Sequence, residues 1–305
     1  FLMKQVTAWR KEHDWLRDQP VVPQQQVVRD FISAKKAFFD KIRKAPRFKS
    51  KKKSSPSLNY TVRGFSITDA GRLKLAGNIV IPVVWSRDLP VDPSSVRVFR
   101  DSCGDWWASF VVEVQQDPKP RDNDGRIGID WGVKTPATGS RPGFDMGYTP
   151  RAKSNAKNLV KYQRRMARLK AKQDWENYRK AKKKKSKLER RVKRQRKEQS
   201  RKWAQHVARN NKIVAMEDFK PKFLSKKKNM AKKSADIAIG TAKRELISAC
   251  QTFGSDLYAI DPHYTTMDCS NCGTRAKSKL ELGVRTFKCS TCNIVLDRDV
   301  NAARN

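Results

Sequence analysis

The sequence predicts a mixed α/β protein in which a small antiparallel β-barrel precedes a larger domain of strands and helices. Three observations support this fold class. Short strand-like runs separated by turn residues occupy 58–114, which is typical of a barrel or a curled antiparallel sheet. From residue 126 onward, apolar strands alternate with helical stretches, as in α/β domains. Two Cys-x-x-Cys pairs near the C-terminus predict a small metal-binding subdomain.

The charge of the chain indicates a polyanionic partner. Its 305 residues carry a formal net charge of +38, and the pI is near 10.3. Because such a charge repels itself, we expect bound nucleic acid. No apolar run approaches the roughly 18 residues of a membrane span, and no signal peptide is recognised, so no membrane partner is expected. Cys103 and Cys250 stand alone, which indicates a reducing compartment, and we expect a prokaryotic cytoplasmic location, with nucleoid association when DNA is bound.

The N-terminal part predicts a helical segment over 1–45, interrupted at Pro20, with Pro23 in the first turn of a second helix. Such helices form a packing unit more often than a catalytic one. Residues 44–57 are a basic linker, for which a solvated segment and a phosphate-tracking loop stay equally open.

The barrel is expected over 46–120, with a hairpin loop at 101–105. Trp106 and Trp107 could each stack on bases, but adjacent residues of a strand point to opposite faces. At least one of the two is therefore expected in the core. A polar linker, 117–123, follows.

A second domain is expected over 124–305. Its first strand places Gly128, Asp130 and Gly132 on one face. The glycines would leave room for a metal ion and a phosphate to approach the backbone beside Asp130. An acidic residue at an ordinary strand end is the alternative interpretation.

The segment 151–210 is the most basic part and predicts two long helices, packed antiparallel along a narrow apolar seam. Its cationic surface would lie along a phosphate backbone without reading bases. We expect a buried strand over 211–220 that ends near Glu217 and Asp218. A helix over 235–253 and a strand over 256–266 should follow.

The spacing C-x2-C-x16-C-x2-C of Cys269, Cys272, Cys289 and Cys292 matches a four-thiolate zinc ribbon, expected over 266–295. Disulfides or a redox pair fit poorly with an intracellular basic protein. A closed four-thiolate site is structural and leaves the nearby histidine no ligand role.

Hydrolysis of a phosphodiester bond by two divalent ions requires several carboxylates that converge on one point. Asp130, Glu217 and Asp299 could meet in this way, as in the ribonuclease H fold, and their oxygens suit Mg²⁺ or Mn²⁺. Acids at strand ends are common, so spacing alone leaves this arrangement open.

An ordered set of motifs resembles the TnpB family of transposon-encoded proteins, relatives of the type V CRISPR effectors and of the Fanzor proteins. Each motif alone is unspecific, but the ordered set is specific and extends over most of the chain. The motifs are PRFKSKK (46–52), WWASFVVEV (106–114), GIDWG (128–132), AMED (215–218), CSNCG…CSTC (269–292) and DRDVNAARN (297–305).

The resemblance implies an RNA-guided DNA endonuclease with a RuvC-like nuclease domain, bound to a guide RNA that pairs with one strand of a double-stranded DNA target. Carried over motif by motif, it makes Asp130, Glu217 and Asp299 the catalytic, magnesium-binding carboxylates, with Asp297 as a neighbour. Glu217 is preferred to Asp218, because the two residues face opposite sides of the strand. The resemblance assigns the early helices to recognition and the barrel to a wedge role.

The resemblance also implies further residues before Phe1 and after Asn305. Three alternatives stay open: a nuclease-dead, RNA-guided DNA-binding regulator, a miniature type V CRISPR effector, and an unguided zinc-ribbon RNA-binding protein. The first would be expected to lack members of the acidic triad. A monomer and a homodimer on RNA also both stay open.

Overall fold

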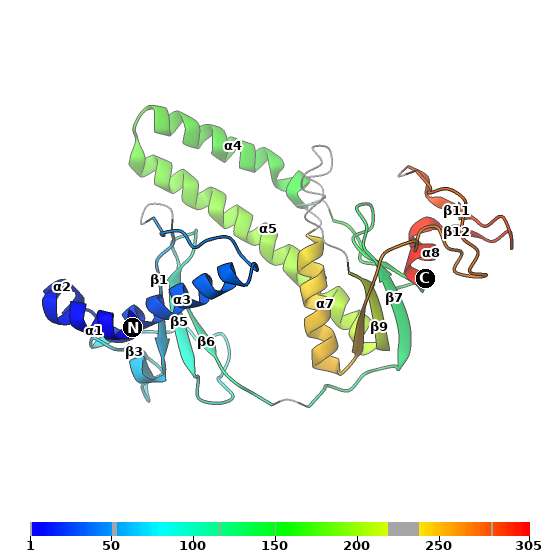
Figure 1. Cartoon of the computed structure of the whole chain (residues 1–305). Coiled ribbons are helices and arrows are strands. Elements are labelled where there is room, and N and C mark those ends of the chain that lie inside the picture. The colour runs from blue at the N-terminus through cyan, green and yellow to red at the C-terminus, as the bar shows by residue number, and fades with distance from the viewer. Residues whose placement is uncertain (1, 51–53, 116, 150, 219–237, 282) are drawn as a thin grey trace. The chain divides into compact units, whose positions relative to one another are not determined.

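The computed structural model describes residues 2–50, 54–115, 117–149, 151–218, 238–281 and 283–305, without the side chains of 151–154. The chain divides into two compact units, Phe1–Gln116 and Asp117–Asn305 (Figure 1). Among the described residues, no helix combines the length and the apolar character that crossing a membrane requires.

The first unit opens with the predicted helical segment, which consists of α1 (Leu2–Glu12), α2 (Asp14–Arg17) and α3 (Val21–Phe39). Pro23 lies in the first turn of α3, where its missing N–H leaves no helical hydrogen bond unmade. The Arg10 guanidinium donates to the carbonyl oxygens of Leu16 at 2.6 Å and Gln19 at 2.8 Å. These bonds satisfy the backbone where α2 ends and the chain turns into α3.

Two three-stranded antiparallel sheets form the rest of this unit, in the orders β1-β5-β6 and β2-β3-β4. Their strands are β1 (Ser57–Thr61), β2 (Phe65–Ile67), β3 (Leu73–Leu75), β4 (Ile79–Ile81), β5 (Ser95–Arg100) and β6 (Trp106–Val111), with a 3-10 turn at Val62–Gly64. Both sheets contribute to one small core with α3, through Val22, Tyr60, Leu73, Leu75, Val96 and Val98.

The β5–β6 hairpin closes at the predicted loop, where the Asp101 carboxylate accepts the backbone N–H groups of Cys103 and Asp105 at 2.8 and 3.0 Å. The prediction that Trp106 or Trp107 is a core residue is wrong, because they are 60% and 41% exposed. Among the described residues, no tight packing covers either ring at this end of β6, whereas Ala108 and Phe110 further along the strand pack against the core.

The second unit contains a four-stranded sheet of order β10-β9-β7-β8. The strands β7 (Gly125–Asp130), β9 (Asn211–Glu217) and β10 (Asp256–Ile260) run parallel, and the short β8 (Thr138–Gly139) is antiparallel to β7. Parallel strands joined through helices define the α/β class that the alternating pattern predicts.

Helices lie on both faces of this sheet (Figure 1). The helices in the described part of the unit are α4 (Arg151–Ala171), α5 (Trp175–Arg209), α7 (Ile239–Phe253) and α8 (Arg298–Arg304). On one face, α5 and α7 pack in a core that includes Ile127, Trp131, Trp203, Val214 and Leu246. The other face receives α8, whose Ala303 carbonyl lies directly over Gly128.

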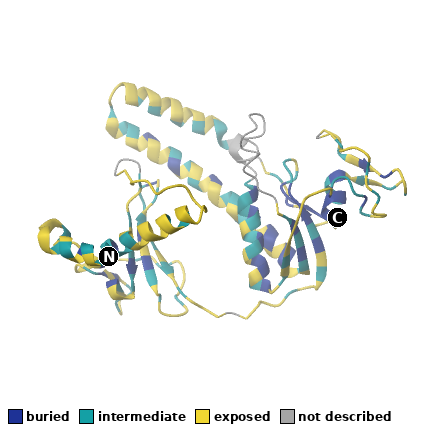
Figure 2. Cartoon of the chain, viewed as in Figure 1, coloured by how far each residue is buried: buried dark blue, intermediate teal, exposed yellow. Residues whose placement is uncertain are grey.

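The two predicted basic helices are α4 and α5, which form a hairpin (Figure 1). The Asp174 side chain caps α5 by accepting the backbone N–H of Asn177 at 3.1 Å. In Figure 2, exposed residues prevail along α4 and the first part of α5, and buried residues gather where α5 meets α7. The C-terminal end of α5 therefore anchors the hairpin in the core.

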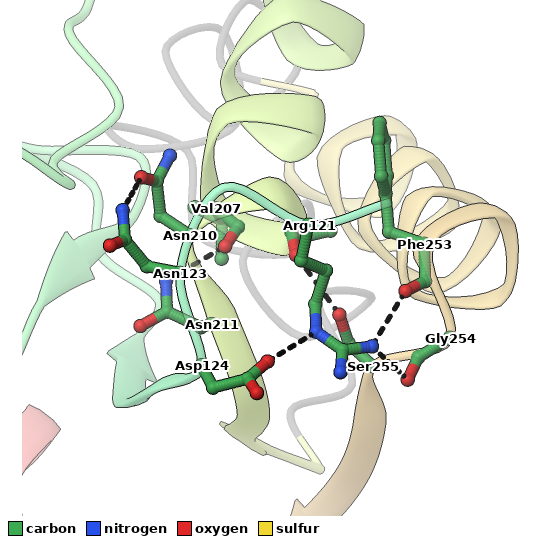
Figure 3. Close-up of polar contacts among 10 residues, drawn as sticks. Arg121, Asn123, Asp124, Val207, Asn210, Asn211, Phe253, Gly254 and Ser255 are labelled. Atoms are coloured by element: carbon green, nitrogen blue, oxygen red, sulfur yellow. Dashed lines mark hydrogen bonds and ion pairs between the residues drawn. The ribbon is translucent and has the colours of Figure 1, made fainter. Parts of the chain in front are cut away.

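The segment predicted as a polar linker packs against the second unit (Figure 3). The Arg121 guanidinium donates to the carbonyl oxygens of Phe253 and Gly254 at 2.9 and 2.8 Å and to the Asp124 carboxylate at 2.8 Å. It thus places a positive charge at the C-terminal end of α7, where the helix dipole favours a cation. Asn123 adds a bond of 2.8 Å to Asn210, just beyond α5.

Three predicted boundaries differ from the structure. The strand expected over 211–220 ends at Glu217, and residues 219–220 lie outside the described residues. The helix expected from residue 235 is described from Ile239 onward, and residues 219–237 lie outside the described residues. The strand expected over 256–266 ends at Ile260, because Pro262 has no N–H for a ladder bond and a tight turn follows.

Candidate functional site

Asp130 and Glu217 lie at the carboxyl ends of two neighbouring parallel strands, β7 and β9. Gly128 is opposite Ala215 in this ladder, so both acids, two residues further along, point to the α8 side of the sheet. Their side chains share a hydrogen bond. Only 8% of Asp130 is exposed. The strand register thus brings together two acids that are 87 positions apart in the sequence.

The Glu217 carboxylate is held by two further groups. It accepts a hydrogen bond from the backbone N–H of Trp131, and the hydroxyl of Thr265 lies 3.5 Å from its Oε1. Thr265 is itself buried and belongs to the turn after β10. These contacts fix the orientation of Glu217 toward Asp130.

The two acids have raised pKa values. Burial raises the pKa of Asp130 to about 8, with further contributions from the charges of Glu217 and Asp299 and a small opposing one from Arg298. Burial also raises the pKa of Glu217. One proton therefore stays on the Asp130–Glu217 pair at neutral pH. A divalent cation that binds this pair must displace the proton.

Asp299 approaches the pair from the first turn of α8. The Asp297 carboxylate caps this helix by accepting the N–H of Asp299 at 2.8 Å and of Val300 at 3.3 Å. The Asp299 carboxylate forms an ion pair with Arg285, whose Nη1 lies 3.0 Å from Oδ2 and 3.2 Å from Oδ1. The charge of Asp299 therefore acts on Asp130, while the Asp299 carboxylate is itself bound to Arg285.

The three acids do not form a single compact ligand group. Among the described residues, one group has all of its possible metal-ligand atoms within 4.8 Å of one another, and this group is the four cysteines. Asp130 and Glu217 are therefore hydrogen-bonded to each other, and the neighbouring Asp299 forms an ion pair with Arg285.

Asp218, the neighbour of Glu217, takes no part in this cluster. Its carboxylate forms an ion pair of 3.0 Å with Lys243 on α7, and its side chain is 55% exposed. Its backbone N–H donates to the carbonyl of Ile260. The two adjacent acids therefore have different surroundings, one in the cluster and one on the surface.

The glycines around Asp130 do not provide the predicted open space. A Cβ at Gly128 would lie 1.8 Å from the carbonyl oxygen of Ala303, and a Cβ at Gly132 would lie 2.6 Å from that of Thr135. Gly128 therefore lets α8 approach the sheet, and Gly132 permits the turn that follows β7. A cavity of about 270 Å³ lies on this face, and Gly128, Glu217 and Thr265 are among the residues that line it.

The four cysteines form a second centre, in the segment that connects β10 to α8. Sγ of Cys269 lies 3.7 Å from that of Cys292, and Sγ of Cys272 lies 3.6 Å from that of Cys289. These distances exclude disulfides and match the separation of about 3.8 Å that Zn–S bonds of 2.3 Å give in a tetrahedron. The group can hold a metal ion.

The core around the cysteines is small. Its buried residues are Cys269, Cys289 and Phe287. Phe287 lies on β11 (Thr286–Lys288), which forms a two-stranded sheet with β12 (Val295–Asp297). His263 takes no part in the cysteine group and pairs with Asp261. A core of this size needs a metal to hold it together.

Thr265 and Arg285 are site residues that sequence reasoning did not single out. Both contact an acid of the cluster through the fold alone, over 48 and 14 positions of sequence. Neither belongs to a spacing pattern with a chemical rationale, so only the structure reveals them.

Comparisons with known proteins agree with this architecture. The family model described as "Probable transposase" matches residues 109–237, and the one described as "Cas12f1-like, TNB domain" matches 240–305. A "Putative RNA-guided DNA endonuclease" of Streptomyces pristinaespiralis is 34% identical over 98% of this chain and 74% of its own length. The "Putative RNA-guided DNA endonuclease InsQ" of Escherichia coli (strain K12) is 28% identical over 98% of this chain and 77% of its own length.

A solved structure shares the fold. The "Cryo-EM structure of the Cas12f1-sgRNA-target DNA complex" superposes with a TM-score of 0.50 at 16% identity, over 88% of this chain and 67% of the other. Fold and site together define a mixed α/β protein with a carboxylate cluster at a strand edge and a four-cysteine metal centre. The chain belongs to the TnpB family of transposon-encoded RNA-guided nucleases, which confirms the resemblance of its motifs.

Proposed function

We propose that this protein is an RNA-guided DNA endonuclease that hydrolyses phosphodiester bonds at Asp130, Glu217 and Asp299. The observation that carries the proposal is the buried Asp130–Glu217 pair, whose side chains are hydrogen-bonded at the carboxyl ends of two parallel strands. Burial of two neighbouring carboxyl groups costs folding free energy, and pKa shifts of this kind are typical of catalytic sites. The names of the relatives support the same activity.

In this proposal, 124–305 is a RuvC-like domain of the ribonuclease H class, with the zinc ribbon at 266–295 and the basic helices at 151–210. The β7–β9 ladder supports it, because parallel strands deliver both acids to one edge. The segment 1–45 would contribute to recognition, and 46–120 would form the wedge, for which the two antiparallel sheets provide the strands.

Mg²⁺ or Mn²⁺ would be held by the oxygens of Asp130, Glu217 and Asp299, and such ions activate water and stabilise the leaving oxygen. The chain's own part is to hold the acids in place. The N–H of Trp131 and the hydroxyl of Thr265 orient Glu217, and burial excludes bulk water from Asp130. Asp130 must lose its proton and Asp299 must release Arg285 before both can act as ligands.

Zinc is the metal that the four-cysteine centre would hold. Four thiolates in a tetrahedral arrangement leave no open position, so this site would be structural. Its position between β10 and α8 supports a role in setting α8, and hence Asp299, against the sheet.

The partners in this proposal are a guide RNA and a double-stranded DNA target. The net charge of +38 and the weakly buried α4–α5 hairpin support extended contacts with phosphate backbones. The guide would read the target by base pairing, and the protein would hold the heteroduplex by its shape.

Asp130→Asn tests the catalytic assignment, with Asp218→Asn as the matched control. We expect the first variant to lose cleavage by at least about 100-fold, because loss of a group that stabilises transition-state charge typically costs this much. Guide and target binding should persist, and Asp218→Asn should cleave like the wild type, since Asp218 is 55% exposed and forms its ion pair with Lys243 on α7, outside the cluster. Cleavage by Asp130→Asn, or loss of RNA binding with it, would refute the assignment.

A further inference from the structure

The turn after β10 contains a strained aromatic residue. Tyr264 has a φ of +63°, a region that bulky residues rarely adopt and that costs of the order of 1–3 kcal/mol. Its carbonyl oxygen accepts the N–H groups of Met267 and Asp268 at 2.7 and 2.9 Å. The turn therefore holds Tyr264 in a conformation that glycine would adopt without strain.

This backbone conformation sends two neighbouring side chains into different environments. Thr265 is 8% exposed, and its hydroxyl lies 3.5 Å from Glu217. Tyr264, one residue earlier, is 50% exposed. An aromatic ring thus lies at the surface, one residue from a group that contacts a proposed catalytic acid.

A fixed arginine covers part of this ring. Cζ of Arg275 lies 3.8 Å from the centre of the Tyr264 ring. The guanidinium is held in place by two bonds to the Asp268 carboxylate, of 2.6 Å from Nε and 3.0 Å from Nη2. Arg275 remains 52% exposed at its side chain. Ring and guanidinium therefore form an ordered surface of two stacked planar groups.

We infer that Tyr264 and Arg275 form a stacking platform for a base of the DNA strand that enters the catalytic site. The inference rests on the proposed function. Aromatic rings with nearby arginines bind single-stranded nucleic acid by stacking, without base preference. Since Tyr264 adjoins the residue that contacts Glu217, the strand to be cut is the nucleic acid that passes this surface.

The alternative is that the stack only stabilises the turn, and Tyr264→Gly separates the two. Glycine removes the ring and also relieves the positive φ, so the variant should fold at least as well as the wild type. For a platform, we expect KM for target DNA to rise about 10-fold with kcat little changed, since stacking on one aromatic residue contributes a factor of this order. Tyr264→Trp should retain the wild-type KM. An unchanged KM in Tyr264→Gly would overturn the inference.

A spectroscopic experiment gives a second, independent measurement. 2-Aminopurine is placed near the cleavage point of the target strand, and the probe is bound to the guide-loaded Asp130→Asn protein. Stacking should quench its fluorescence, and the additional Tyr264→Gly substitution should restore it. Equal fluorescence with and without the ring would refute stacking. Failure of the wild type to cleave any guided target would instead refute the proposed function, whereas quenching by Tyr264 would still be measurable.

Discussion

At the residue scale, the state of the site depends on one proton between Asp130 and Glu217. Burial and the charges of Glu217 and Asp299 hold the pKa of Asp130 near 8, against the weaker effect of Arg298. A divalent cation binds the ionised carboxylate, so its binding must release this proton. Metal binding and pH are therefore coupled in the physiological range.

We predict that the Mg²⁺ concentration for half-maximal cleavage falls as pH rises from 6 to about 8 and then levels off. Displacement of one proton changes the apparent affinity by about tenfold per pH unit below the pKa. The measurement is a Mg²⁺ titration of cleavage at several pH values. A half-saturating concentration that is constant between pH 6 and 8 would contradict the assigned proton.

The same shift predicts the stability of the metal-free protein. Because the folded pKa of Asp130 lies above its ordinary value, its contribution to stability is complete below that ordinary value and is lost as pH rises through about 8. We expect the Tm without metal to fall from pH 6 to pH 9 in the wild type, and to fall less in Asp130→Asn. If Tm falls equally in both proteins, the pH dependence comes from groups other than Asp130.

At the element scale, the contact between α8 and β7 positions the third acid. Gly128 is required there because a Cβ would lie 1.8 Å from the Ala303 carbonyl oxygen, a backbone atom that cannot rotate away. Any side chain at this position must displace α8 and, with it, Asp299. Gly128 thus affects the site by allowing α8, and with it Asp299, to lie close to β7.

Gly128→Ala should lower the free energy of unfolding by about 1–3 kcal/mol, the usual effect of overpacking, and should also reduce cleavage. Gly147→Ala is the matched control, because a Cβ at Gly147 would meet nothing within 4 Å. Chemical denaturation with both variants measures the difference. Equal stability of the two variants would show that α8 does not pack as described.

The four-cysteine segment, the proposed zinc ribbon, is the element that most depends on a metal. Its core contains few apolar side chains around Cys269 and Cys289, so removal of the metal should unfold it locally. We expect Cys289→Ser to bind less zinc, measured by elemental analysis, and to lose cleavage. The core of α5, α7 and the sheet should retain its helical circular dichroism. Full cleavage by a zinc-free protein would contradict the structural role.

At the scale of the whole molecule, the features that depend on residues close together in the sequence were predictable. The cysteine spacing, the helices of 151–209 and the acids at strand ends follow from local geometry. Tertiary contacts were not. The exposure of Trp106 and Trp107 depends on which part of β6 packs against the core, and the roles of Gly128 and Arg285 depend on where α8 and the ribbon come to lie.

The central claim is that a bound RNA directs cleavage by the Asp130 site, and one measurement tests it most directly. The protein is purified with its RNA, that RNA is sequenced, and its variable part is exchanged for a second sequence. DNA targets matching each guide are then offered to the wild type and to Asp130→Asn. We predict that the wild type cuts only the DNA that matches the guide it carries, and that Asp130→Asn binds this DNA without cutting it. Cleavage that ignores the guide, or that survives Asp130→Asn, would contradict the account.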